Sequence, residues 1–387
     1  MGLLKIGIVV GERSGEKLAV DLIKSIRKSI PNVEVYGVMG KELRDLGCVA
    51  IAPMETISVM GFVEPLLNLR KLIKFRRWVV EFFIQDPPDV FIGIDAPAFN
   101  LYVEDKLHKQ GIPTIHYVSP SVWAWKKYRI KTIKSSVDLM LTLFPFEKKF
   151  YDQHQVDSIF VGHPAADKIP LEIDTKRYRD RLNIPHNKTV LAMLPGSRNG
   201  EIKSHLNVYL DAASLLLKEI NNLHVIIPCV SDNHKTIIEQ GISELELGFS
   251  CDVLMDSSWG VMGACDFAIV TSGTASLELM LHKKPMVIAY RTHWLNYQIA
   301  KKLVTISHIG LPNLIAGEGL IVELIQDEVT AENIYFNLKA LLNADTKSKV
   351  LENKFIDMHK QLRQDASKKA ASAILSMLGL ENNECAI

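Results

Sequence analysis

The sequence predicts an α/β protein built from two domains, each containing a parallel β-sheet. At 387 residues the chain is too long for one ordinary hydrophobic core. Strand-like apolar runs alternate with segments of helical periodicity, and this alternation begins a second time after about residue 185. Hydrophobic residues make up 48% of the chain and charged residues 23%, so there is enough apolar material for two cores.

The first half alternates strands and helices in a regular order. Residues 4–10 form a continuous apolar run, which is typical of a strand buried on both faces. A polar turn follows, and apolar side chains at helical spacing predict a helix over residues 16–28. Further strands are expected at residues 33–38, 90–94, 114–118, 139–143 and 158–161.

The second half repeats the pattern. A strand over residues 189–194 and a helix over residues 201–219 open it, and residues 331–380 predict helices only. The other expected strands are 224–229, 267–271 and 286–290. We therefore divide the chain into a first domain, a polar linker, a second domain and C-terminal helices, at residues 1–167, 168–186, 187–345 and 346–387. These last helices are expected either to cross back onto the first domain or to exchange between the subunits of a homodimer.

Charge and cysteine content argue against several classes of protein. The net charge of +1 provides no global field for nucleic acid, so no nucleic-acid partner is expected. The five cysteines are scattered and form no C-x-x-C pair, which fits a reducing compartment better than a disulfide framework or a zinc site. The N-terminus lacks the features of a signal peptide, and no apolar stretch approaches the roughly 18 residues of a membrane span. We expect a cytoplasmic protein that is able to lie on a membrane surface.

Two strand-to-helix turns of the second half have the chemistry of a phosphate site. In the first, Gly196 lets the backbone approach an anion, and the helix start offers N–H groups. Arg198 adds a charged guanidinium group that is able to make a bidentate contact. The second repeats this arrangement with Ser272, Gly273 and Thr274. Each turn alone also fits an ordinary connection with solvated side chains. Because ligands of parallel sheets bind beyond the carboxyl ends of strands, the two turns together favour a nucleotide.

The rest of the sequence contains none of the common motifs of other nucleotide sites or of metal sites. The turn from Gly11 to Gly15 lacks the G-x-G-x-x-G spacing, so we discount NAD and FAD. The chain contains neither a P-loop sequence nor an Asp-x-Asp triplet, and its histidines form no H-E-x-x-H motif. No cofactor and no metal are expected.

Several sequence blocks resemble the lipid-A-disaccharide synthase family, whose members are glycosyltransferases with two Rossmann-like domains facing across a cleft (the GT-B fold). The most specific block is Tyr-Val-Ser-Pro-Ser-Val-Trp-Ala-Trp at residues 117–125. Other blocks follow in the same order over most of the chain, at residues 60–64, 88–97, 143–147, 161–164, 194–198, 272–278 and 311–317.

The resemblance implies an inverting, metal-independent sugar transfer. The substrates would be UDP-2,3-diacylglucosamine and 2,3-diacylglucosamine 1-phosphate, and the products lipid A disaccharide 1-phosphate and UDP. The reaction would take place at the cytoplasmic face of the inner membrane of Gram-negative bacteria. A UDP-GlcNAc 2-epimerase or another GT-B enzyme is a second interpretation. A non-catalytic lipid- and nucleotide-binding paralogue is a third, because Glu16 and Ala98 stand where the family has aspartates.

The resemblance also assigns roles to individual residues. Asp95 ends an apolar strand, matches the family's carboxylate and is our candidate general base, with a turn or N-cap aspartate as the alternative. Arg198, Ser197 and the amides after Ser272 would meet the charge of the leaving UDP. Glu278 matches the family's ribose-binding glutamate. Weaker candidates near the uracil or the diphosphate are Glu201, Arg291 and Asn313.

Residues of the first half are expected to hold the acceptor or to close over the donor. The turn after the first strand contributes Gly11, Glu12, Ser14 and Gly15. The acceptor side would be lined by Tyr117, Ser119, Ser121, Trp123 and Trp125. Core packing or a hinge explains the two tryptophans equally well.

Residues 57–80 combine an apolar side with a basic cluster, which favours an interfacial amphipathic helix on an anionic membrane surface. The basic residues are Arg70, Lys71, Lys74, Arg76 and Arg77. Substrates with acyl chains would enter most easily from such a surface. A buried helix with a solvated basic edge fits the same pattern.

Overall fold

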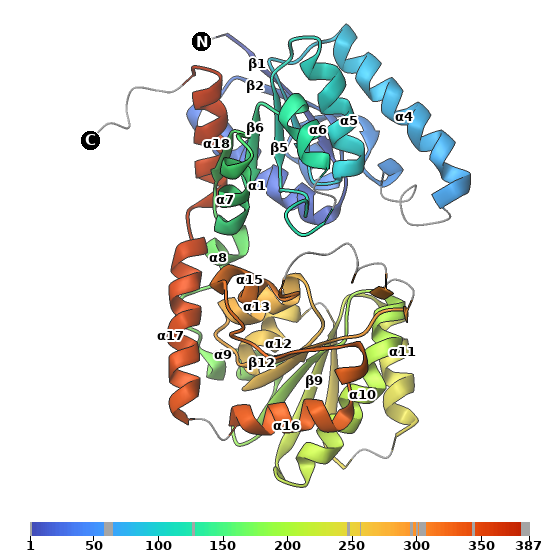
Figure 1. Cartoon of the computed structure of the whole chain (residues 1–387), viewed down its shortest axis with the longest axis vertical. Helices are drawn as coiled ribbons and strands as arrows, with labels where there is room; N and C mark the ends of the chain where they lie inside the picture. The colour runs from blue at the N-terminus through green and yellow to red at the C-terminus, as the bar shows by residue number, and fades with distance from the viewer. Residues whose placement is uncertain are drawn as a thin grey trace. The chain divides into compact units, whose positions relative to one another are not determined.

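The computed structural model describes residues 2–57, 65–125, 128–245, 248–255, 257–294, 297–298, 301, 307–342 and 345–380, without the side chains of 65–69 and 345–348. The chain forms two compact units. The first contains Met1–Asp167 and Leu362–Ile387, and the second contains Lys168–Gln361. Each unit is a parallel sheet covered by helices, which confirms the predicted fold class (Figure 1).

The first unit contains a seven-stranded parallel sheet of order β3-β2-β1-β4-β5-β6-β7. Its strands are β1 (Leu4–Val10), β2 (Val33–Met39), β3 (Val49–Pro53), β4 (Val90–Ile94), β5 (Thr114–Tyr117), β6 (Leu139–Thr142) and β7 (Ser158–Phe160). The strand order changes direction between β1 and β4, which are neighbours. The turns after these two strands therefore lie at the switch point of the sheet, where ligands of such folds bind.

Helices connect these strands and cover the sheet. They are α1 (Arg13–Ser29), α2 (Lys41–Asp45), α4 (Pro65–Gln85), α5 (Pro97–His108), α6 (Arg129–Ser136), α7 (Pro145–Gln153) and α8 (Pro164–Lys168). One part of the core contains Val9, Phe83, Phe91 and Phe99 from four different elements. The C-terminal helix α18 (Ala366–Met377) packs against α1 of the same chain (Figure 1).

The second unit contains a six-stranded parallel sheet of order β10-β9-β8-β11-β12-β13. Its strands are β8 (Thr189–Leu194), β9 (Leu223–Cys229), β10 (Ser250–Met255), β11 (Phe267–Val270), β12 (Met286–Tyr290) and β13 (Glu323–Ile325). The direction of the strand order changes between β8 and β11, which pair through Leu194 and Val270 at their carboxyl ends. This places the two glycine turns of the sequence analysis beside each other.

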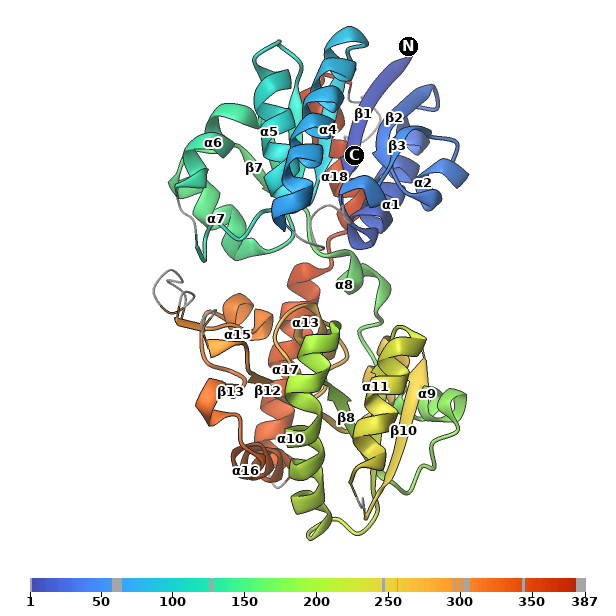
Figure 2. The ribbon, with the colours of Figure 1, turned by 90° about the vertical axis from the view of Figure 1, so that its right-hand side faces the viewer.

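The helices of the second unit follow the strands closely. They are α9 (Thr175–Leu182), α10 (Asn199–Leu217), α11 (Asp232–Ser243), α12 (Ser258–Ala264), α13 (Thr274–Leu281), α15 (Leu311–Ala316), α16 (Ala331–Leu342) and α17 (Asp345–Leu362). Helix α10 packs between α11 and α16 (Figure 2). The expectation of helices only over residues 331–380 agrees with α16, α17 and α18.

Residues 168–186, which the sequence analysis treats as a linker, belong to the second unit. They contain α9, which packs against α12. The buried Arg179 donates to a carboxylate oxygen of Asp266 at 2.7 Å and to the carbonyl of Ala264 at 2.9 Å. The polar composition of the segment did not indicate this anchoring, because it depends on the ion pair of a buried arginine rather than on an apolar face.

Candidate functional site

Both predicted phosphate turns line one cavity of about 380 Å³ in the second unit. Gly196, Ser197 and Arg198 follow β8, and the segment from Ser272 to Ala275 follows β11. The strands are neighbours, so parallel pairing brings the turns after them to the same edge. The structure thus brings together the residues that the sequence analysis paired.

The backbone of these turns is open to an anion. Gly196 has φ 124° and Gly273 has φ 110°, and only glycine adopts such angles without strain. In the described part of the chain, neither α10 nor α13 has a side-chain hydrogen bond at its N-cap. The Ser276 N–H donates to the Gly273 carbonyl at 3.1 Å, so within the described residues the N–H groups of Thr274 and Ala275 remain available to a ligand. The positive end of the helix dipole lies behind them.

Glu201 engages the donors of the first turn. One carboxylate oxygen accepts from the Ser197 N–H at 3.0 Å, and the other accepts from Nη1 of Arg198 at 2.8 Å. A Cβ on Gly196 would lie 2.5 Å from Cβ of Glu201, so glycine also makes this close approach possible. The carboxylate of Glu201 holds the donors in place and carries the kind of charge that a phosphate would bring to them.

The remaining walls of the cavity add residues that the sequence analysis missed. Thr274 and Glu278, which the sequence analysis selected, line the cavity, and so does His234, which it did not select. The buried Nδ1 of His234 has no hydrogen-bond partner within the described residues. One feature of the sequence could have pointed to His234 as a site residue: it lies in the first helical turn after strand β9, three residues beyond the N-cap Ser231. Apolar lining comes from Pro228, Val230 and Met262.

Two predicted residues lie away from this cavity. Arg291 donates through Nη2 to the carbonyl of Val329 at 2.6 Å, so its guanidinium is tied to a neighbouring loop. Asn313 is fully buried; its Nδ2 donates to the Ile321 carbonyl and to Glu323, and its Oδ1 accepts from the Ile321 N–H. In this structure both residues hold loops together, and a direct contact with a nucleotide is not available to Asn313.

A second cavity of about 300 Å³ lies in the first unit, at the carboxyl ends of β4 and β5. Its lining includes the predicted Asp95, Ser119 and Ser121 together with Trp125. It also includes Arg129, the first residue of α6, which the sequence analysis did not select. Arg129 follows the aromatic block by four positions, and nothing in its spacing marked it.

The backbone around this cavity is strained. Asp95, Ala96 and Val118 have φ values of 54°, 45° and 80°, in a region that non-glycine residues and especially β-branched ones avoid. Asp95 is held in place because its Oδ1 accepts from the Ala96 N–H at 2.8 Å and its own N–H donates to the Tyr117 carbonyl at 3.0 Å. Such strain concentrates at functional sites, and here it positions the carboxylate at the cavity wall.

The turn after β1 packs closely on the turn that carries Asp95. A Cβ on Gly11 would lie 2.3 Å from Cβ of Ala96, and one on Gly15 would lie 3.3 Å from Ile94. The two glycines therefore act through close packing, while Glu12 and Ser14 of the same turn are exposed. This turn is beside the candidate base but does not line its cavity.

Glu16 and Ala98, the two residues that stand where the family resemblance leads one to expect aspartates, have different surroundings. Glu16 is buried, and its Oε1 accepts from the N–H of Leu43 at 3.1 Å, so its carboxylate anchors the start of α2. A Cβ on Gly40 would lie 2.1 Å from the other oxygen, which shows that glycine there makes room for the longer side chain. Ala98 is exposed, and its carbonyl accepts from Nη1 of Arg76 at 3.2 Å.

Two aromatic residues expected at the acceptor side lie outside the cavity that Asp95 lines. Tyr117 is fully buried, and burial raises the pKa of its hydroxyl well above the usual range. Trp123 packs edge-on against Phe146 at 4.8 Å between ring centroids. Tyr117 is thus part of the core of the first unit, whereas Trp123 is partly buried.

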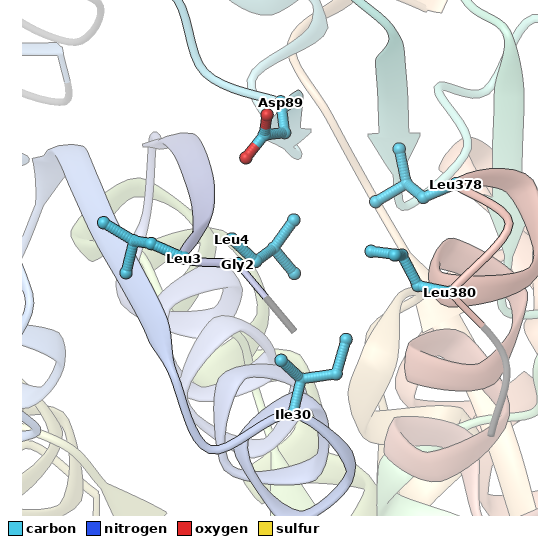
Figure 3. Close-up of a pocket in the computed structure, with 7 residues that line it drawn as sticks. All are labelled: Gly2, Leu3, Leu4, Ile30, Asp89, Leu378 and Leu380. Carbon is cyan, nitrogen blue, oxygen red and sulfur yellow. The ribbon is translucent and has the colours of Figure 1, made fainter.

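A further cavity of about 380 Å³ lies at the opposite, amino end of β1. Leu4 and Ile30 face Leu378 and Leu380 across it (Figure 3). Its polar group, Asp89, already accepts from the Lys5 N–H at 2.7 Å. Since ligands of parallel sheets bind at the carboxyl ends, we assign this cavity no part in the site.

Solved structures share the architecture of this chain. The S. aureus MnaA-UDP co-structure matches with a TM-score of 0.65 and 14% identity, over 98% of this chain and 98% of that one. The crystal structure of UDP-GlcNAc 2-epimerase from Neisseria meningitidis bound to UDP-GlcNAc matches with a TM-score of 0.62 and 14% identity, over 98% and 100%. At these identities the likeness shows the fold, and it supports the expected GT-B class.

Proteins of the same family have a much higher sequence identity to this chain than these solved structures do. The lipid-A-disaccharide synthase of Pseudomonas aeruginosa is 44% identical over 376 residues, which span 97% of this chain and 98% of the relative. The synthase of Alkalilimnicola ehrlichii is 41% identical over 383 residues, or 97% and 99%. The family model for lipid-A-disaccharide synthetase matches residues 6–374. Nearly the whole chain thus carries the family's pattern, and the chain belongs to the lipid-A-disaccharide synthase family.

Proposed function

We propose that this chain transfers 2,3-diacylglucosamine from UDP to the 6-hydroxyl of 2,3-diacylglucosamine 1-phosphate, with inversion at the transferred carbon. The observation that carries the proposal is the family match over residues 6–374, in which Asp95 and Arg198 are both present. The 2-epimerase interpretation is not favoured, because such enzymes share the fold at only 12–14% identity.

The cavity of the second unit is the proposed site for UDP. The Ser197 N–H, the Arg198 guanidinium and the first N–H groups of α13 would hold the diphosphate. These groups stabilise the negative charge that develops as the bond to UDP breaks, and one such donor is worth about 10²–10³ in rate. Glu278 suits the ribose diol, and Val230 with Met262 offers an apolar surface for the base.

The cavity of the first unit is the proposed site for the acceptor. The Asp95 carboxylate would take the proton of the 6-hydroxyl as its oxygen attacks the anomeric carbon of the donor. The bond between that carbon and the UDP oxygen breaks on the opposite side, and the electron pair leaves with UDP. Base catalysis by a positioned carboxylate contributes roughly 10²–10⁴-fold.

Helix α4 is the proposed contact with an anionic membrane. Residues 58–64 of the predicted stretch 57–80 lie outside the described residues. Arg70, Lys71, Lys74 and Arg77 are exposed, and Trp78 is 42% exposed beside them. Arg76 differs, because its guanidinium lies 3.7 Å from the ring centroid of Tyr102. No helix in the described part of the chain has the length and hydrophobicity that crossing a bilayer requires.

The transfer is tested by incubating both substrates with the protein and measuring disaccharide and UDP. We expect Asp95→Asn to lose about 10²-fold or more in kcat and Arg198→Ala to lose about 10²-fold. The matched controls Asp211→Asn and Lys203→Ala remove exposed charges on α10 and should keep the wild-type rate. UDP release without disaccharide would identify a hydrolase, and an Asp95→Asn variant of full activity would remove the base assignment.

Membrane contact is tested by flotation with liposomes containing anionic lipid. Binding should be strong at low salt and weak at high salt, since the Debye length falls from about 30 Å at 0.01 M to about 3 Å at 1 M. Replacing Lys71 and Lys74 by Glu should abolish binding, and Lys235→Glu on α11 should not. Absence of binding at low salt would contradict the proposal.

A further inference from the structure

Arg129 lines two adjoining cavities of the first unit. One is the cavity that contains Asp95 and Ser121. The other, of about 490 Å³, lies between α5 and α6 and includes Tyr102 and Tyr128. Pro97 and Arg129 line both, so the Arg129 side chain stands where the two cavities meet. A ligand that reaches Asp95 from the cavity between α5 and α6 would pass the guanidinium.

The charge of Arg129 is not neutralised within the described residues. Its side chain is half-buried, yet no carboxylate of the described chain lies within 4 Å of the guanidinium and no hydrogen bond ties it to another described group. Asp105, the acidic residue that lines the cavity between α5 and α6, pairs instead with Lys109 at 2.7 Å and Lys106 at 3.3 Å. A guanidinium is always charged, and removing it from water without a partner is costly.

The surroundings of Arg129 favour a phosphate over other anions. Arg129 is the first residue of the eight-residue helix α6, and its N-cap Tyr128 makes no side-chain cap hydrogen bond to the described residues. The first N–H groups of α6 therefore add donors and the positive helix end next to the guanidinium. A guanidinium fork together with several N–H donors matches the three oxygens of a phosphomonoester.

We infer that Arg129 and the start of α6 bind the phosphate of the acceptor sugar, while Asp95 faces the hydroxyl at the other end of the same sugar. The inference rests on the proposed function, which supplies an acceptor with one phosphate and one reacting hydroxyl. It adds a specificity determinant: the enzyme distinguishes a sugar 1-phosphate from the same sugar without phosphate through Arg129. The phosphate also fixes which way round the sugar lies in the cavity.

The test compares two acceptors, 2,3-diacylglucosamine 1-phosphate and the same sugar without phosphate. Arg129→Ala should lower kcat/KM for the phosphorylated acceptor by roughly 10- to 100-fold, mainly through KM, because a charge-assisted contact is lost. It should leave kcat/KM for the other acceptor unchanged, so that the preference disappears. Arg129→Lys should keep part of the preference. The control Lys131→Ala removes an exposed charge two residues further on and should behave as wild type.

Two outcomes would overturn the inference: an equal loss on both acceptors, or an unchanged preference in Arg129→Ala. Wild-type protein that forms no disaccharide from either acceptor would instead contradict the proposed function. In that case titration with glucosamine 1-phosphate and with glucosamine decides about Arg129. The phosphate site is supported if the phosphorylated sugar binds more tightly and Arg129→Ala removes this difference. It is refuted if the two sugars bind equally, or if Arg129→Ala leaves the difference unchanged.

Discussion

Oε1 of Glu104 lies 2.7 Å from Nδ1 of His116, and both side chains are completely buried. Glu104 is on α5, and His116 is on β5 directly beside Gly93 of β4. One turn before Glu104, the Nδ2 of Asn100 donates to the main-chain carbonyl of Asp95 at 2.8 Å. A buried polar cluster therefore lies under the strained turn that carries the candidate base.

Burial and ion pairing have opposite effects on the pKa values of Glu104 and His116. Burial raises the pKa of Glu104, although the nearby His116 partly opposes this. Burial lowers the pKa of His116, but the charge and hydrogen bond of Glu104, together with the charge of Asp95, outweigh it, and the pKa of His116 is raised overall. Removing one partner would leave the other buried without compensation, which is why such pairs are costly to break.

Gly93→Ala should destabilise the protein strongly. A Cβ there would lie 2.1 Å from Oε1 of Glu104 and 2.9 Å from Cβ of Asn100. Both side chains are inside the core, so we expect a loss of about 2 kcal/mol or more in the free energy of unfolding. Urea unfolding measures it. The control Gly200→Ala, where no atom lies within 4 Å of the new Cβ, should be neutral or slightly stabilising. Equal effects of the two substitutions would contradict this account.

Asn100→Ala should lower kcat and leave the KM for the UDP-sugar unchanged. The amide donates to the carbonyls of Asp95, Ile94 and Val9, and so fixes the end of β4. Without it the Asp95 carboxylate loses its position, and a misplacement of about 1 Å costs up to about 10²-fold in rate. Steady-state kinetics with each substrate varied would show the effect. A variant that is less stable but turns over at the wild-type rate would limit Asn100 to a structural role.

Glu201→Gln should tighten the binding of UDP. The Glu201 carboxylate accepts from the Ser197 N–H and from Arg198, which are the donors proposed for the diphosphate. A neutral side chain of the same shape removes the repulsion between like charges, so we expect the Kd for UDP to fall roughly 3- to 10-fold, or about 1 kcal/mol. Calorimetric titration of UDP tests this, with Asp211→Asn on the same helix as the control. Weaker binding would show that Glu201 contacts the nucleotide directly.

His282 should make the stability of the protein depend on pH. Its Nδ1 donates to the Glu278 carbonyl at 2.8 Å, while its buried Nε2 has no partner in the described chain. Burial, with a contribution from Lys284 and Lys283, lowers the pKa of His282 to about 4. Between the ordinary pKa of about 6.5 and this value, the unfolded chain binds a proton that the folded chain does not. The contribution of His282 to the free energy of unfolding is therefore complete above about pH 6.5 and is lost as the pH falls toward 4.

The expected loss from this residue between pH 7 and pH 5 is about 2 kcal/mol. Urea unfolding at both pH values measures it. His282→Gln should reduce the difference between them, because glutamine does not titrate. The control His186→Gln, at an exposed ion pair with Asp180, should keep the wild-type dependence. An unchanged dependence in His282→Gln would mean that other groups cause it.

The central strands were predictable from local sequence, as was the edge strand β7, but the other three edge strands were not. The apolar runs at β1, β4 and β8 fill the centres of the two sheets and match the expected strands closely. The missed strands β3, β10 and β13 are all at sheet edges. An edge strand is partly exposed and therefore lacks a continuous apolar run, so its pairing with a neighbour rather than its own composition makes it a strand.

The sequence alone determined the parallel-sheet architecture, the two glycine turns after β8 and β11, and Asp95 at the end of β4, because these depend on apolar periodicity and on glycine at strand ends. The tertiary structure decided which side chains meet. It placed Glu201 on the donors of its own turn, enclosed Asn313, paired Glu104 with His116, and brought Arg129 to the cavity of Asp95. Apart from that of Glu201, these contacts join residues on different elements. A polar or charged side chain takes its role from the partner that folding brings to it.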